Sequence, residues 1–168
     1  SCFDAAQQRP FNLCRLLAGS EGTLFIGVEY ELNLVPLPPS GALLCVHCRD
    51  VDEALQATLV VMRHREAGAG LGAEGACQLT GCELIDKKIL DCTKCNAEQT
   101  RNRSFVVGDP GAVLVVEVKH VDRDAVLAKL RRIEDDLRGA GLGYAYPVLV
   151  ADEGNKVWEL RQIGRAHV

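Results

Sequence analysis

The sequence contains no apolar run close to the ~20 residues that a membrane-spanning helix needs, since stretches such as Val113–Val116 have only the length of strands. Nor is positive charge in excess: 19 Lys and Arg residues stand against 23 Asp and Glu residues, and the basic ones are scattered. A nucleic-acid-binding protein would need a basic stripe to neutralise phosphates. We therefore expect neither a membrane span nor a nucleic-acid partner.

Methionine is also scarce. It occurs once, at Met62, and the chain begins with Ser1. We therefore expect the 168 residues to be a processed product or a piece excised from a longer protein. With 48% hydrophobic and 25% charged residues the composition is that of a globular protein, long enough for one core or for a small domain with part of a second.

Cysteine, in contrast, is abundant and even in number. A small secreted scaffold held by disulfides would be short, loop-rich and poor in aliphatic residues, whereas this chain carries Leu, Val and Ala at regular spacing. We therefore predict reduced thiols in a cytoplasmic protein. The eight residues concerned are Cys2, Cys14, Cys45, Cys48, Cys77, Cys82, Cys92 and Cys95.

The first forty residues are predicted to form a helix, a turn and a strand. Residues 11–18 have leucines on one side and are followed by Gly19, a natural helix end. Residues 24–35 look like a long strand. The run Pro36–Gly41 contains three prolines, which remove hydrogen-bond donors and fix the backbone, so it is the best candidate for a domain boundary.

A strand–helix–strand pattern follows the prolines. Residues 42–48 predict a strand, and Asp50 with Glu53 resembles a capping box that opens a helix. The apolar face of this helix is predicted from three residues at helical spacing, namely Leu55, Leu59 and Met62. Residues 67–75 are a glycine-rich loop, and residues 77–85 predict the next strand. Asp86 can cap a short helix through about Asn96.

The pattern then repeats. Residues 108–111 predict a turn and residues 112–119 the clearest strand, after which Asp122 caps a helix. One face of that helix carries Val126, Leu130, Ile133 and Leu137. A further strand at 143–150 and a helix at 153–163 follow. This order predicts an α+β fold, a ferredoxin-like antiparallel sheet with helices on one face.

The sharpest local motif is the run Gly19–Leu24, GSEGTL, between the first predicted helix and strand. Its two glycines allow the backbone to approach a ligand closely, and its hydroxyl and N–H groups can hold a phosphate oxygen. The same letters also suit an ordinary polar turn, because short Gly/Ser loops are common.

This motif belongs to a longer stretch that resembles the FAD-linked oxidases and dehydrogenases of the vanillyl-alcohol-oxidase type. The glycolate oxidase, D-lactate and D-2-hydroxyglutarate dehydrogenase branch is the most similar. There a "GSEGTLG-I-I/V-T-E" segment runs into "L-PLP", matched here by Gly19–Leu24, Glu29 and Leu34–Pro39. Further similar segments are Glu83–Asp86 (ELID), Asn96–Arg103, Leu114–Glu117 (LVVE) and Val157–Arg161 (VWELR).

The resemblance implies the end of an FAD-binding domain in residues 1–39, a substrate-binding cap domain in 40–151 and the start of a return segment in 152–168. It implies a protein that oxidises a D-2-hydroxy acid, and a fragment that is inactive in isolation. It also points to an iron–sulfur region further along the protein, and it is compatible with a homodimer. The residues it assigns to FAD are Gly19, Ser20, Glu21, Gly22 and Thr23, and Arg161 is assigned to the substrate carboxylate.

No catalytic residue and no metal ligand is assigned. The four histidines, His47, His64, His120 and His167, are scattered without ligand spacing. Of two Cys-x-x-Cys pairs, Cys45/Cys48 falls in a strand, where positions three apart face opposite sides, and Cys92/Cys95 in a helix, so we expect no shared zinc site. Asp86 is assigned to helix capping and Glu83 to no role. The alternative function is a ferredoxin-like binding or thiol redox module.

Overall fold

The computed structural model describes residues 12–34, 40–65, 77–95, 97–150 and 152–161. The chain divides into two units, residues 1–34 and 35–168. The division falls beside the proline-rich run, of which residues 35–39 lie outside the described part, as do the predicted loop at 67–75 and Asn96. None of the helices in the described ranges is long and apolar enough to cross a membrane.

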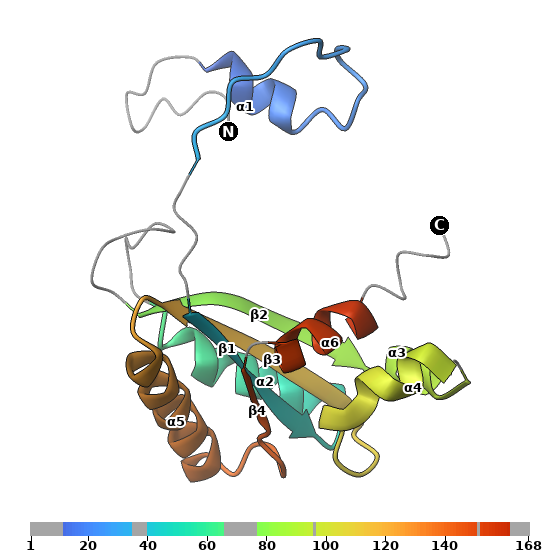
Figure 1. Cartoon of the computed structure of the whole chain (residues 1–168), viewed down its shortest axis with the longest axis vertical. Coiled ribbons are helices and arrows are strands. Elements are labelled where there is room, and N and C mark those ends of the chain that lie inside the picture. Colours follow the sequence, from blue (N-terminus) through green and yellow to red (C-terminus); the bar gives the residue numbers. More distant parts are fainter. Residues whose placement is uncertain (1–11, 35–39, 66–76, 96, 151, 162–168) are drawn as a thin grey trace. The chain divides into compact units, whose positions relative to one another are not determined.

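The second unit is organised by one antiparallel sheet of four strands (Figure 1). The strands are β1 (Ser40–Cys48), β2 (Gln78–Asp86), β3 (Ala112–His120) and β4 (Val148–Val150), in the order β2-β3-β1-β4. Helix α2 (Val51–Met62) connects β1 to β2, and α5 (Arg123–Gly139) connects β3 to β4. This is the interleaved pair of βαβ units that defines a ferredoxin-like sheet. The predicted α+β class is confirmed.

Aspartates start the three helices for which caps were predicted. The side chain of Asp50 accepts a hydrogen bond from the backbone N–H of Glu53 at 2.7 Å, and Asp86 and Asp122 cap the helices that follow them in the same way. The carboxylate of Glu53 accepts two further backbone hydrogen bonds, one from the N–H of Arg49 and one, at 2.9 Å, from the N–H of Gly143. The buried Glu53 carboxylate thus holds the start of α2 against the chain that follows α5.

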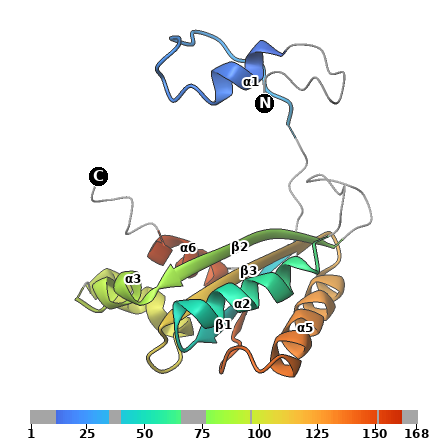
Figure 2. The same ribbon diagram turned by 180° about the vertical axis from the view of Figure 1, so that it is seen from behind.

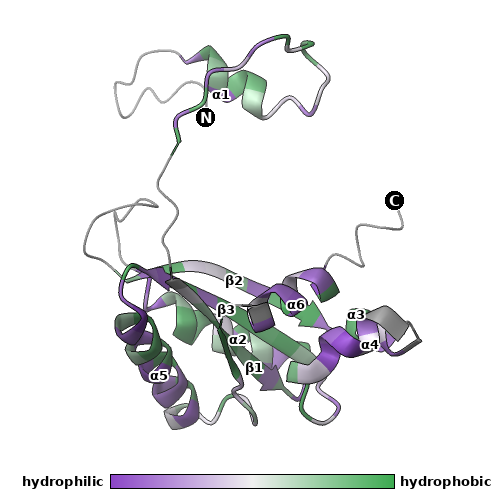
Figure 3. Ribbon diagram, in the orientation of Figure 1, coloured by the Kyte–Doolittle hydropathy of each residue, from purple (hydrophilic) through white to green (hydrophobic). Residues whose placement is uncertain are grey.

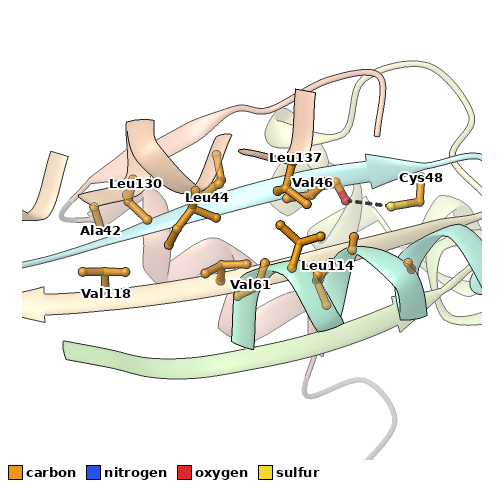
Figure 4. Close-up of a cluster of buried hydrophobic side chains, with 14 of the residues drawn as sticks. Ala42, Leu44, Val46, Cys48, Val61, Leu114, Val118, Leu130 and Leu137 are labelled. Carbon is orange, nitrogen blue, oxygen red and sulfur yellow. Dashed lines mark hydrogen bonds between the residues drawn. The ribbon is translucent and has the colours of Figure 1, made fainter. Parts of the chain in front are cut away.

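Helices α2 and α5 cover one face of the sheet (Figure 2). Even-numbered residues of β1 and β3 point to this face, and the four predicted residues of α5 are all buried against them. Figure 4 shows how the side chains of Leu44, Leu114 and Leu137 meet there. In Figure 3, which colours residues by hydropathy, the central strands are largely hydrophobic and the outer side of α5 is hydrophilic.

The predicted apolar face of α2 was wrong. Leu55 is 54% exposed and Leu59 68% exposed, and Met62 also lies on the outer side. The residues buried against the sheet are Ala54, Ala57, Val60 and Val61. Both sets have helical spacing, so periodicity cannot choose between them. The inward side is fixed instead by the buried Glu53, one turn before Ala57, and small alanines let the helix approach the strands closely.

The opposite face carries further helices. They are α3 (Lys87–Cys92), the short helices η2 (Thr93–Cys95), α4 (Ala97–Asn102) and η3 (Arg103–Phe105), and α6 (Asp152–Arg161). Of these, α3 and α6 were predicted from the sequence and α4 and η3 were not. Leu90, Phe105 and Leu160 from these segments pack on Cys45 and Val113. The expectation of helices on one face therefore holds for α2 and α5, while a second, smaller core lies on the other side.

Two predicted strands are corrected. Residues 24–34 form no strand, because no other described segment of the first unit offers a partner; Ile26, for example, is 93% exposed. The strand predicted at 143–150 is reduced to Val148–Val150 with one bridge between Ala145 and His47. Pro147 lacks an N–H group, so it can only accept from Cys45, and regular pairing starts after it.

Candidate functional site

In the first unit, the predicted cofactor residues form a tight turn after helix α1 (Leu13–Ala18). The N–H of Thr23 donates to the carbonyl of Ser20 at 2.9 Å, and the two central residues, Glu21 and Gly22, both have positive φ angles of 49° and 77°. Positive φ is easy for glycine and uncommon for glutamate. The motif thus places one non-glycine residue in the left-handed region at the tip of the turn.

The hydrogen bonds of this turn determine what it can offer a ligand. The hydroxyl of Ser20 donates to the carbonyl of Leu17 at 2.8 Å, and that of Thr23 to the carbonyl of Ser20 at 2.6 Å. The backbone N–H groups of Glu21 and Gly22 donate to no acceptor among the described residues. A Cβ built on Gly22 meets no atom within 4 Å. Two N–H donors beside open space therefore remain available.

Arg161, the predicted carboxylate-binding residue, lies at the end of α6 in the second unit. Its Nε contacts Oε2 of Glu83 on β2, and its side chain is 42% exposed. A guanidinium group carries five N–H donors in a fixed plane. Because Glu83 takes the Nε side, the two terminal nitrogens have no acceptor in the described part of the chain and can meet a carboxylate through two parallel hydrogen bonds.

A hollow of about 420 Å³ lies on the same face of the sheet, between the strands and α6. Its size falls in the range of ligand pockets, roughly 300–1,000 Å³. Apolar atoms of Leu43 and Leu149 line it together with the ring of Trp158 and the charged residues Glu117 and Lys119. Gly41, Ala42, Gly154 and Asn155 complete the lining.

The charged pair of the hollow is held by the neighbouring strand. Lys119 Nζ lies 3.0 Å from Oε1 of Glu117, and the hydroxyl of Thr80 donates to Oε2 of Glu117 at 2.7 Å. Thr80 sits where the pairing of β2 with β3 shifts register, between Leu79 and Gly81. Such a bulge re-aims a side chain. Both carboxylate oxygens of Glu117 are thereby engaged, and the carboxylate is fixed in place.

Among the described residues, no group of three His, Cys, Asp or Glu side chains forms a metal site on the cysteines. Cys45 packs in the core under α6 and Cys48 in the core under α2, on opposite faces as predicted. Burial raises the pKa of each thiol to about 12, which removes the reactive thiolate at neutral pH. Cys92 is exposed, while Cys2 and the side chain of Cys95 lie outside the described residues.

Both ring nitrogens of His47 have partners, whereas His120 accepts from the N–H of Asp122 through Nδ1 and its buried Nε2 has no partner among the described residues. His47 is fully buried; its Nε2 accepts from the N–H of Val107 at 3.1 Å and its Nδ1 lies 3.0 Å from the carbonyl of Cys45. These contacts fix a neutral ring that carries its proton on Nδ1. Burial lowers the pKa of His47 accordingly. His167 is outside the described part, within which no three His, Cys, Asp or Glu side chains gather as a metal site.

No family model matches the chain, and no curated protein matches it.

Sequence reasoning assigned Arg161 but not the groups around it. Glu83, given no role, is the partner of Arg161, while Glu117, Lys119 and Trp158 line the hollow. A signal was present: Gly41 and Gly81 are glycines inside strands, which often mark a close approach of a ligand. The five turn residues and Arg161 lie in different units.

Proposed function

We propose that the chain is the substrate-binding cap, with adjoining flavin-domain segments, of an FAD-dependent oxidoreductase that oxidises a D-2-hydroxy acid of the glycolate, D-lactate or D-2-hydroxyglutarate type. Support comes from the resemblance of the GSEGTL, ELID and VWELR segments, which lie in order along the chain. The observation that carries the proposal is the placement of Arg161, fixed through Nε by Glu83 with its terminal nitrogens free of described acceptors.

The role of Arg161 is to hold and orient the substrate carboxylate. Two parallel hydrogen bonds from the terminal nitrogens define both the position and the plane of a carboxylate. Glu83 is a positioning residue, since it restrains the guanidinium without taking those nitrogens. The pair is only partly buried, with Glu83 34% exposed, so a substrate can reach it from solvent. Orientation of this kind contributes to rate by removing unproductive geometries.

The turn at Gly19–Thr23 fits part of a flavin cradle. Its two open donors, the N–H groups of Glu21 and Gly22, suit carbonyl or phosphate oxygens. The exposed carboxylate of Glu21 disfavours a second negative charge nearby, so these donors suit the neutral carbonyl oxygens of a flavin ring better than its pyrophosphate. When bound, FAD supplies the acceptor for a hydride from the carbon that bears the hydroxyl.

We further propose a cytoplasmic location, supported by described cysteines that form no disulfide, namely Cys14, Cys45, Cys48, Cys82 and Cys92. An iron–sulfur region in the complete protein and a homodimer remain part of the proposal on the strength of the resemblance alone.

The test is made on the complete protein that contains this chain. We expect it to purify with bound FAD and to be bleached anaerobically by a D-2-hydroxy acid. Arg161→Lys should raise KM at least tenfold, because lysine cannot make the bidentate contact. Glu83→Gln, which keeps an acceptor for Nε, should change KM less than Glu83→Leu. Arg132→Lys, on the exposed side of α5, is the matched control and should leave KM unchanged.

Two outcomes would overturn the proposal. One is a complete protein that holds no flavin and is not reduced by any D-2-hydroxy acid. The other is one equivalent of tightly held zinc on the thiols, which would favour the ferredoxin-like thiol module instead.

A further inference from the structure

Two strand glycines stand directly across from the two charged residues of the hollow beside α6. Gly41 of β1 is paired with Lys119, and Gly81 of β2 with Glu117. A Cβ at Gly41 would lie 3.2 Å from the side chain of Lys119, and one at Gly81 would lie 3.2 Å from Cβ of Glu117. Any larger residue would therefore press on the charged pair. Glycine weakens a strand interior, so its presence twice here indicates that the space is used.

The polar groups of the hollow are mainly unused donors. The ammonium of Lys119 has three N–H bonds, and Glu117 is its one acceptor among the described residues. The amide of Asn155, in the first turns of α6, has no partner in the same part of the chain. Glu117 is less available to a ligand, because Lys119 and Thr80 each already donate to one of its two oxygens. The site therefore favours a ligand that accepts hydrogen bonds and carries negative charge.

The rest of the lining is apolar. Leu43 projects from β1 and Leu149 from β4, and the ring of Trp158 lies above Gly81, with its Cη2 4.0 Å from the position of a Cβ there. A flat or branched apolar group would exclude water from these surfaces and bury their area. An apolar wall beside an ammonium group, whose partner Glu117 is itself held by Thr80, suits an amphiphilic acid.

We propose that this hollow binds a small organic carboxylate with an apolar body, whose carboxylate meets Lys119 and Asn155 and whose body packs against Trp158, Leu43 and Leu149. The site is formed by the second unit alone and requires no flavin. Its test is therefore independent of the oxidoreductase proposal, and either can fail without the other.

Trp158 provides the measurement, because it is the one tryptophan of the sequence. Phenylacetate is titrated into the 168-residue chain while Trp158 fluorescence is followed, with calorimetry as a second readout and N-acetyltryptophanamide as the blank for non-specific quenching. We expect a saturable change with phenylacetate, and at least tenfold weaker binding of phenylacetamide and of phenethylamine, which have the same ring without the negative charge.

Variants assign the contact to Lys119. Lys119→Gln should weaken phenylacetate binding at least tenfold and Lys119→Arg should restore most of it. Glu117→Gln should bind as tightly as the parent or more tightly, since the competing carboxylate is removed. Lys94→Gln, an exposed lysine on η2, is the control and should bind like the parent. Urea unfolding of each variant identifies any that fails to fold.

The proposal is overturned if the fluorescence change does not saturate, if acid and amide bind alike, or if Lys119→Gln binds like the parent. It is also overturned if phenylalanine binds more tightly than phenylacetate and Glu117→Gln weakens that binding. Such a result would assign the hollow to an amino acid rather than to a carboxylate.

Discussion

On one face of the sheet, α2 and α5 bury an apolar layer along the whole of β1 and β3, from Ala42 to Cys48 and from Ala112 to Val118. On the other face, a core around Leu90, Phe105 and Leu160 covers one end, while the remaining end is hollow and carries charges. The two faces share the same strands. Alternate residues of β3 therefore serve different purposes: Val116 and Val118 pack, whereas Glu117 and Lys119 line the site.

This difference shows how a small fold combines stability with a binding surface. The closed face, which α2 and α5 cover, supplies most of the apolar burial by itself. The open face can then carry polar groups and empty space, which would otherwise cost stability. The following predictions test how complete that division is.

The largest expected effect is the difference in reactivity between the buried thiols and the exposed ones. With a pKa of about 12, Cys45 and Cys48 have a thiolate fraction about a thousandfold below that of an ordinary thiol. Peptide mapping after brief labelling with a thiol reagent at pH 8 should therefore find Cys14 and Cys92 modified, and Cys45 and Cys48 only after denaturation. Rapid labelling of Cys45 alone would show that the second face is open along its full length.

Core truncation should distinguish the closed face from the hollow. Leu114→Ala removes a fully buried side chain and should lower the free energy of unfolding by 2–5 kcal/mol, counting transfer and cavity effects as about that size. Leu149→Ala enlarges a space that is already open and should lower it by about 1 kcal/mol or less. Urea unfolding measures both. Equal losses would contradict the division between the faces.

His47, on the second face, should make stability depend on pH. Burial lowers its pKa below the ordinary value of 6.5 in the folded state, so as pH falls below 6.5 the unfolded chain takes up a proton that the folded chain does not. The contribution of the neutral His47 to the free energy of unfolding is complete above pH 6.5 and is lost on acidification. His47→Gln should lower the free energy of unfolding by about 1–3 kcal/mol at pH 7.5, by disturbing the contact with Val107.

Unfolding followed between pH 7.5 and 5 checks this assignment. Stability of His47→Gln should fall less steeply with acidification than that of the parent. Leu149→Ala, which removes no titratable group, is the control and should keep the parent slope. An unchanged slope in His47→Gln would exclude His47 as the titrating group.

The smallest effect is expected on the outer side of α2. Replacing both Leu55 and Leu59 by Gln should change the free energy of unfolding by no more than about 0.5 kcal/mol, because both are exposed. Val61→Ala, on the buried side of the same helix, should cost about 2 kcal/mol. A large loss from the leucine pair would mean that α2 is rotated, with the predicted face toward the sheet.

In the second unit the sequence was sufficient for the order of the strands, for helices α2, α3, α5 and α6, for the aspartate caps and for the buried face of α5, because cap residues and apolar periodicity are local signals. It failed for the buried face of α2, where two apolar stripes compete and a tertiary contact from Glu53 to Gly143 decides. Within the site, Arg161 came from a resemblance, whereas its partner Glu83 is 78 positions away in the chain and becomes visible only when β2 and α6 pack together. The hollow has no sequence signal except two strand glycines.

The irregular outer strands also affect how the molecule avoids association. Exposed strand edges are templates for adding a strand from another chain, and short strands, prolines and bulges discourage it. Here β4 is three residues long and follows Pro147, while β2, at the opposite edge, is bent by the bulge at Thr80. Neither border offers a long straight ladder, so intermolecular sheet growth is disfavoured at both ends. The bulge that helps to fix Glu117 thus also protects against aggregation.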